Sequence, residues 1–370
     1  MTAITDPIVG RLVERVRAAA ADRMPVCIRG GGTKSFYGGA AIGDLLDTRS
    51  LKGITSYQPS ELVITALAGT PLAELEAALA ELNQYLPFEP PHFDVGGTVG
   101  GMVAAGLSGP ARASVGSVRD YVLGASLING RAELLTFGGQ VMKNVAGYDV
   151  SRVLAGSLGI LGVITEVSLK LMPIVPAELT LAFELDEMAA LRQLNAWLAQ
   201  PLPLNASCWT EIDGHGTLYL RLRGAKAAVD TSCVRLGGRR IDADEAATLW
   251  SGCRDQSSSW FANASGECNL WRVSVPQQTP ALPLPGSHLV EWHGGVRWYY
   301  LPTGQASIVR EAARVAGGHA TLFKKATHEA GIAVPPFDSL SAPLAKIHQR
   351  LKQEFDPHNI FNRGRLYSDL

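Results

Sequence analysis

The sequence predicts an α+β protein in which a glycine-rich, ligand-binding portion is joined to a smaller lobe built on an antiparallel sheet. Glycines are dense in two stretches, residues 29–35 and 94–109. Apolar runs of strand length alternate with amphipathic stretches of helix length. The composition changes at Met172–Pro176, and no glycine loop of this kind occurs from there to about residue 330. These three observations separate two parts of different construction.

Length and charge exclude several classes of protein. A chain of 370 residues suggests two domains, or one large domain with an inserted lobe. With 46% hydrophobic and 18% charged residues, the chain is neither disordered nor fibrous. The formal net charge of −1 provides no basic field for DNA or RNA, so no nucleic-acid partner is expected. Any anion site must therefore be local.

The cysteines and the N-terminal residues bear on metal content and on location. The five cysteines are widely spaced without a C-x-x-C pair, which argues against a disulfide framework, a zinc site or a cysteine-bound iron–sulfur cluster. Asp213, His215 and Asp244 are too scattered to suggest a metal site. The first residues lack the apolar region of a signal peptide, and no run of about 18 apolar residues occurs. We expect a cytoplasmic protein, with attachment to the inner face of the membrane through partners left open.

The N-terminal half contains two helices with clear start signals. Asp6 caps the first helix and Pro7 lies in its first turn. The second helix is predicted to have Thr70 as its cap and Pro71 as its first residue. Its apolar face comprises Leu72, Leu75, Leu79 and Leu82. Strands are expected at Val26–Ile28, Leu45–Thr48, Ile54–Tyr57 and Leu62–Ala68.

Later elements follow the same patterns. Asn129-Gly130 predicts a tight hairpin between strands at Tyr121–Ile128 and Ala132–Phe137. Val150–Leu154 is helix-like, and a strand reaches Leu171. The lobe and tail are expected to contain strands at 179–184, 206–212, 217–222, 270–275, 289–292, 296–301 and 320–323, and helices at 187–199, 245–253, 307–315 and 344–355.

The two glycine-rich loops suggest a phosphate-binding site. Gly96, Gly97, Gly100 and Gly101 flank Thr98-Val99, and so many glycines let backbone N–H groups converge on one anion. Close packing alone explains one such loop equally well. The presence of another glycine-rich loop earlier in the chain, at Arg29–Ser35, favours a binding site for a phosphate or diphosphate. Neither loop has the Gly-Lys spacing of a P-loop or a G-x-G-x-x-G, so P-loop and Rossmann interpretations have little support.

Four motifs together resemble a known family. The motifs are PVCIRGGGTKSF, GGTVGGMVAAGLSGP, the segment from VLGASLINGRAE to VSLKLMP, and the closing FDPHNIFNRGR. They are similar to motifs of the FAD-binding domain of the vanillyl-alcohol oxidase / p-cresol methylhydroxylase (PCMH) superfamily. Within this superfamily, the chain resembles the FAD-binding E-type subunits of bacterial glycolate oxidases in its short length and in the segments KNVAGYDV and EWHGGVRWYYLP. The match to the FAD domain covers about residues 20–175 and the tail.

The resemblance implies a fold and a set of site residues. It implies a PCMH-type FAD-binding domain of two subdomains (1–175), a smaller α+β cap, substrate or interface domain (176–330), and a C-terminal segment that returns to the FAD domain (331–370). Carried over position by position, the FAD-binding residues are Arg29, Gly30, Gly31, Gly32, Thr33 and Lys34 in the first diphosphate loop, Gly97, Thr98, Gly100 and Gly101 in the second, Ser108 and Gly109 after it, and Gly162, Val163 and Ile164 beside the adenine and ribose.

Several of these residues have ordinary alternatives. Arg29 is also explained by an ion pair, Lys34 by exposure to solvent, and the glycines at 156, 159 and 162 by strand–helix packing. Many superfamily members attach the flavin through a histidine after the triple glycine, whereas Thr33 occupies that position here. We therefore expect non-covalent FAD.

The catalytic residue stays unknown. Relatives that oxidise 2-hydroxy acids carry a histidine-rich catalytic segment, but the nearest text here, Asn263–Leu270, has no histidine. His293, Tyr148 and Lys143 are the candidates for a role near the flavin, and packing or solvent exposure explains each of them as well.

Three functions follow from the resemblance. The first is an FAD-binding subunit of a glycolate oxidase or dehydrogenase, an FAD-dependent oxidoreductase that converts glycolate to glyoxylate beside a D-type flavoprotein and an F-type iron–sulfur subunit. The second is a non-catalytic assembly subunit that keeps the FAD fold. The third is a stand-alone flavin oxidoreductase acting on another substrate.

Overall fold

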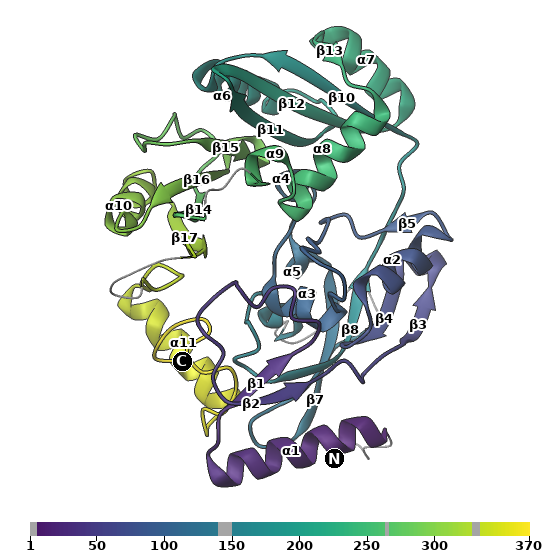
Figure 1. Cartoon of the computed structure of the whole chain (residues 1–370). Coiled ribbons are helices and arrows are strands. Elements are labelled where there is room, and N and C mark those ends of the chain that lie inside the picture. The colour runs from purple at the N-terminus through teal and green to yellow at the C-terminus, as the bar shows by residue number, and fades with distance from the viewer. Residues whose placement is uncertain (1–5, 140–149, 263–265, 328–333) are drawn as a thin grey trace. The chain divides into compact units, whose positions relative to one another are not determined.

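The computed structural model describes residues 6–139, 150–262, 266–327 and 334–370, which form two compact units (Figure 1). Unit 1 comprises Met1–Leu107, Ser117–Pro173 and Ser339–Leu370, and unit 2 comprises Ser108–Gly116 and Ile174–Asp338. The domain boundaries predicted at residues 175 and 330 place Ser108–Gly116 in the FAD domain, whereas in the structure this segment belongs to unit 2. No sequence signal marks this segment.

Unit 1 begins with the predicted capped helix. In α1 (Pro7–Asp22) the N–H groups of the second and third residues donate to Asp6 Oδ1, at 2.7 and 3.4 Å. Strand β1 (Val26–Arg29) pairs in parallel with β2 (Asp44–Asp47), and Phe361 forms a parallel bridge to β1. The apolar face of α1 packs with β1, β2 and the 360–361 segment in one buried cluster. The first subdomain therefore needs the C-terminal residues for its core.

A five-stranded antiparallel sheet forms the rest of unit 1, in the order β3-β4-β8-β6-β7. Its second cluster of buried side chains includes residues from α2 and α3. The elements are β3 (Ile54–Gln58), β4 (Val63–Leu67), α2 (Leu72–Ala80), β5 (Gln84–Tyr85), α3 (Val99–Ala105), α5 (Val118–Tyr121), β6 (Val122–Ile128), β7 (Leu134–Gly138), β8 (Val163–Lys170), β9 (Met172–Pro173) and α11 (Ala342–Phe355), with 3₁₀ turns η1 (Pro59–Glu61) and η2 (Val150–Leu154). The helix-like 150–154 segment is thus a 3₁₀ turn.

The start and the apolar stripe of α2 differ from the prediction. The helix begins at Leu72, and Pro71 occupies the cap position. The hydroxyl of Thr70 instead accepts from Gly53 N–H (2.9 Å) and donates to Gly53 O (3.1 Å), so it ties the helix to the preceding turn. Leu82 lies beyond the end of the helix and is 49% exposed. Placing Leu82 in the core stripe was wrong because the helix is shorter than its leucine repeat.

The hairpin between β6 and β7 forms, but not through a two-residue turn. Ile128 pairs with Leu134, which leaves a longer loop in which Asn129 Oδ1 accepts two backbone N–H groups at 3.0 Å. Gly130 donates its N–H to Phe355 O (2.8 Å), and a Cβ there would lie 2.6 Å from the Asp356 carboxylate. Glycine is needed at 130 because the end of α11 packs against it.

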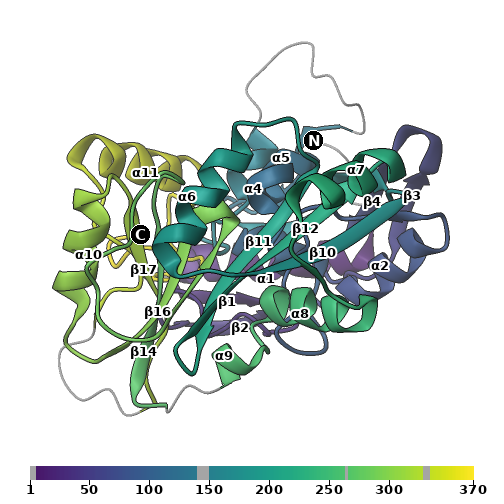
Figure 2. The same ribbon diagram turned by 90° about the horizontal axis from the view of Figure 1, so that it is seen from above.

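Unit 2 is built on an eight-stranded antiparallel sheet in the order β13-β10-β12-β11-β15-β16-β14-β17. Figure 2 labels β10, β12, β11, β16, β14 and β17 among these strands. The strands are β10 (Ala177–Glu184), β11 (Leu204–Ile212), β12 (His215–Gly224), β13 (Arg239–Arg240), β14 (Cys268–Ser274), β15 (His288–Glu291), β16 (Val296–Pro302) and β17 (His319–Lys324). The helices are α4 (Arg112–Val115), α6 (Glu187–Leu198), α7 (Lys226–Leu236), α8 (Ala243–Asp255), α9 (Ser259–Ala262) and α10 (Ala306–Val315), with the 3₁₀ turn η3 (Trp292–Gly294). The predicted antiparallel α+β lobe is confirmed.

Helices cover both faces of this sheet. Leu181 of β10 belongs to a cluster with α6 and α7, whereas the adjacent Thr180 accepts from the Trp250 indole of α8 at 2.8 Å. Successive strand residues point to opposite faces, so α6 and α7 cover one face and α8 the other. Helix α7 was not predicted from the sequence.

None of the helices in the described residues has the length and apolar character needed to cross a membrane. No group of three or more metal-ligating side chains occurs among the described residues.

Candidate nucleotide-binding site

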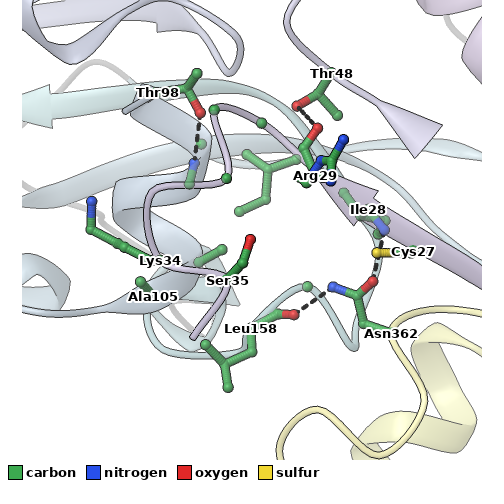
Figure 3. A pocket seen from close by; sticks show the side chains of 18 of the residues that line it. Cys27, Ile28, Arg29, Lys34, Ser35, Thr48, Thr98, Ala105, Leu158 and Asn362 are labelled. Atoms are coloured by element: carbon green, nitrogen blue, oxygen red, sulfur yellow. Dashed lines mark hydrogen bonds between the residues drawn. The ribbon is translucent and has the colours of Figure 1, made fainter. Parts of the chain in front are cut away.

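A cavity in unit 1 brings together the two glycine loops (Figure 3). The first glycine loop, Gly30–Lys34, follows β1, and the second, Gly96–Gly101, leads into α3. A third segment, the turn Gly156–Gly162, precedes β8. Most of the predicted cofactor-binding residues line the cavity, namely Arg29, Gly30, Gly31, Gly32, Thr33, Lys34, Thr98, Gly100, Gly101, Gly162 and Ile164.

Four predicted residues do not line it. Gly97 lies just outside, where a Cβ would be 3.5 Å from Thr33 Oγ1. Val163 is fully buried in the cluster that contains α1. Ser108 and Gly109 belong to unit 2, in which Gly109 O accepts from the Trp292 indole at 3.0 Å. A role for these four in binding remains a prediction.

The glycines allow the two loops to touch. A Cβ on Gly30 would lie 2.3 Å from Thr98 Oγ1, and a Cβ on Gly31 would lie 1.7 Å from Gly96 O. Gly32 has a φ of +77°, a backbone conformation that residues with a side chain rarely adopt. Glycine is thus needed at Gly30 and Gly31 because the second loop lies so close, and at Gly32 because the backbone is left-handed there.

Backbone donors of the first glycine loop lack partners. Within the ranges the structure describes, the N–H groups of Gly30, Gly31, Gly32 and Thr33 donate to no protein acceptor. Four successive amides without acceptors at a cavity wall are suited to an anion with several oxygens, such as a diphosphate. Close packing of the loops explains the glycines but not these four amides without acceptors.

The charges on the wall favour the same ligand. Arg29, Lys34 and Arg365 line the cavity, and no aspartate or glutamate lies among its lining residues. Among the described residues no carboxylate is within 4.0 Å of the Arg29 guanidinium, although the pKa of Asp47 is lowered mainly by Arg49 and to a smaller degree by the charge of Arg29. The remaining wall consists mainly of small apolar side chains suited to a flat ring: Ile28, Ala41, Ala68, Ala104, Ala105 and Ile164.

Two residues of the C-terminal segment that were not predicted as site residues also line the cavity. Asn362 and Arg365 lie in the motif FDPHNIFNRGR, which supported the resemblance without receiving a role. Asn362 Oδ1 accepts from Ile28 N–H and Asn362 Nδ2 donates to Leu158 O, both at 2.7 Å (Figure 3). The motif was the sequence signal that could have pointed to these two residues, but a motif does not show which distant residues its members contact.

The described residues fit FAD. The unpartnered amides and three cations suit the diphosphate, and the small apolar wall suits the adenine ring. When bound, FAD would supply two-electron redox chemistry, and the glycine loops would hold its diphosphate. Thr33 lines the cavity and has no side chain suited to covalent attachment of a flavin.

His293 of unit 2 has both ring nitrogens engaged within that unit. Nδ1 lies 3.0 Å from Ser207 Oγ and Nε2 lies 3.0 Å from Ser114 Oγ. The side chain is 1% exposed, and burial lowers its pKa from 6.5 to about 4. The imidazole is therefore neutral at pH 7 and joins α4 to β11. The other candidates, Lys143 and Tyr148, lie outside the described residues.

Burial of neutral His293 makes unit 2 sensitive to acid. Between pH 6.5 and about 4 the unfolded chain binds a proton at this histidine that the folded chain does not, so stability falls as pH decreases through this window. The expected loss is on the order of 3 kcal/mol. All seven tryptophans lie in unit 2, so urea unfolding followed by tryptophan fluorescence reports this unit. His293→Asn should reduce the loss; an unchanged pH dependence in that variant would contradict the assignment.

Comparison with known proteins agrees with the site. Residues 9–138 match the family model described as "FAD binding domain". The glycolate oxidase subunit GlcE of Escherichia coli K12 is 43% identical over 359 residues, or 97% of each chain. The glycolate oxidase subunit GlcD of Bacillus subtilis 168 is 29% identical over 41% of this chain and 32% of its own length.

A solved structure of alkyldihydroxyacetonephosphate synthase shares the fold. It superposes with a TM-score of 0.63 at 16% identity, covering 95% of this chain and 74% of its own. At this identity the likeness concerns the fold alone. The near-complete alignment at 43% identity establishes the family: this FAD-binding chain belongs to the family of the glycolate oxidase subunit GlcE.

Proposed function

We propose that the chain is the FAD-binding subunit of a glycolate oxidase or dehydrogenase complex. The observation that carries this proposal is 43% identity with the glycolate oxidase subunit GlcE over 97% of both chains. The cavity with unpartnered amides and three cations supports FAD as its ligand. In the complex this subunit would work with a D-type flavoprotein and an F-type iron–sulfur subunit, at the inner face of the cytoplasmic membrane through those partners.

The proposed reaction is a two-electron oxidation of an alcohol. The glycolate carbon would give up a hydride to a flavin of the complex and the hydroxyl would give up its proton to a base, which gives glyoxylate; the two electrons would then leave through the iron–sulfur subunit. The buried, neutral His293 has both nitrogens hydrogen-bonded, which does not favour it as the base. We therefore propose that the substrate site lies on the D-type subunit, with this chain's FAD as partner or relay.

Anaerobic titration with glycolate tests this division of labour. The purified chain alone should keep its oxidised flavin spectrum, whereas the chain assembled with D- and F-type subunits should bleach. Bleaching of the lone chain would show a self-sufficient oxidoreductase instead. A chain that assembles with both partners and supports their activity when freed of FAD would be an assembly subunit.

The attachment of FAD gives a separate prediction. Because Thr33 stands where related flavoproteins carry a flavin-linked histidine, the cofactor should be non-covalent. Precipitation with trichloroacetic acid should leave all flavin absorbance in the supernatant. Yellow colour in the washed pellet would contradict non-covalent binding, while a protein that stays colourless after FAD is added would contradict FAD binding itself.

A further inference from the structure

The cavity is incomplete without the C-terminal segment of the chain. The match to the FAD-binding family ends at residue 138, but the wall continues through the turn Gly156–Gly162 and through Asn362 and Arg365. The residues Ser339–Leu370 that contain the last two return to unit 1 after the whole of unit 2. The segment is therefore in a position to influence a ligand that the glycine loops hold.

Asn362 ties two walls of the cavity together. It is 5% exposed, and its one amide group joins the end of β1 to the glycine turn through Ile28 and Leu158, at 2.7 Å on each side (Figure 3). Its backbone N–H also donates to Val26 O at 3.0 Å. A Cβ on Gly159 would lie 2.6 Å from Asn362 Nδ2, so the turn packs directly on this side chain.

Arg365 fixes the loop that follows the first glycine loop. Its Nη1 donates to Ser35 O (3.0 Å) and Gly39 O (2.6 Å), and its Nη2 donates to Tyr37 O (2.7 Å). Gly39 N–H returns a bond to Arg365 O at 2.8 Å. One guanidinium thus holds three carbonyls of residues 35–39, which directly follow the unpartnered amides.

The charge of Arg365 has no partner of opposite sign within the protein that the structure describes. No carboxylate there lies within 4.0 Å of the guanidinium, and burial lowers its pKa. A half-buried cation surrounded by neutral carbonyls is stabilised by an anion in the same cavity. The diphosphate of the dinucleotide would supply that anion.

From these contacts we propose that docking of the C-terminal segment and binding of FAD are coupled, with Asn362 and Arg365 as positioning residues of the cofactor site. The proposal rests on FAD binding, as the proposed function does, but not on glycolate or on partner subunits. Coupling is reciprocal: a side chain that improves FAD affinity by holding the loops is itself held more firmly once FAD is bound.

The first test measures affinity and uses a matched control. Arg365→Ala in the full chain, freed of FAD and titrated by flavin fluorescence, should raise the Kd for FAD about tenfold. Arg363→Ala removes the same charge two residues away, where the guanidinium contacts Asn359 O and Arg23 O outside the cavity, and should change the Kd less than twofold. An Arg365→Ala chain with the wild-type Kd would overturn the proposal.

The second test distinguishes coupling from a simple structural clamp, and its main comparison uses the wild-type chain alone. Hydrogen exchange of the wild-type chain, with and without saturating FAD, should show slower exchange in peptides covering residues 356–370 when FAD is bound. Arg365→Lys, which keeps the charge but not the three-carbonyl contact, should show an intermediate Kd and weaker protection. Equal exchange of these peptides in both states would overturn the coupling, and a wild-type chain that binds no FAD would refute the cofactor instead.

Discussion

Gly31→Ala is expected to weaken FAD binding strongly, because the added methyl group would push the two glycine loops apart. The added Cβ would lie 1.7 Å from Gly96 O and 2.5 Å from Gly96 C, both backbone atoms. Relief requires moving one loop by more than an ångström, which disperses the amides of Gly30–Thr33. We expect the Kd for FAD to rise on the order of 100-fold, or about 2.7 kcal/mol.

The control for this variant is Gly139→Ala. A Cβ at Gly139 meets nothing within 4 Å, and its φ is not in the left-handed region, so the substitution should leave FAD binding unchanged. Flavin fluorescence titration gives the Kd of both variants, and thermal unfolding of the apoprotein shows whether they fold. Wild-type affinity in Gly31→Ala would mean that the loops are not held against each other in solution.

Lys352→Met is expected to give the largest loss of stability. Lys352 is 5% exposed, and its Nζ donates to Asp356 Oδ2 (2.7 Å), Ile160 O (2.8 Å) and Phe361 O (3.0 Å). Removing the ammonium leaves the Asp356 carboxylate buried without its cation, which typically costs about 3–5 kcal/mol. Urea unfolding followed by far-UV circular dichroism measures the change.

Two comparisons test the physical reason. Lys346→Met changes an exposed lysine of the same helix and should alter the free energy of unfolding by less than about 0.5 kcal/mol. Lys352→Met with Asp356→Asn removes both charges and keeps one acceptor oxygen, for one of the two N–H groups of Ile360 and Phe361 that bond to Asp356, so part of the loss should be recovered. A loss below about 1 kcal/mol in Lys352→Met would show that the pair is not buried as described.

Local signals were predicted correctly where the partners are close in sequence. Asp6 caps α1 through the N–H groups of the next turn, and the alternation of apolar residues gave the strands of unit 2. The prediction was wrong where a distant segment decides the local geometry. Asn129-Gly130 looks like a two-residue turn, yet Gly130 is required by contact with Asp356, far along the chain.

The candidate site divides in the same way. The triple glycine and the second glycine loop indicated a diphosphate because the chemistry of glycine is local. Asn362 and Arg365 received no role, since their partners Ile28 and Ser35 lie 334 and 330 residues away. His293 illustrates the same limit, because its serine partners come from elements far apart in the sequence.

The sequence by itself determined that this chain carries paired glycine loops suited to a dinucleotide, with no basic surface field and no histidine-rich catalytic segment. These are properties of residue type and spacing. Only the tertiary structure decided which glycines approach backbone, which amides remain without acceptors, and which side chains of the C-terminal segment close the cavity. Those features depend on contacts across hundreds of residues, and no local pattern records them.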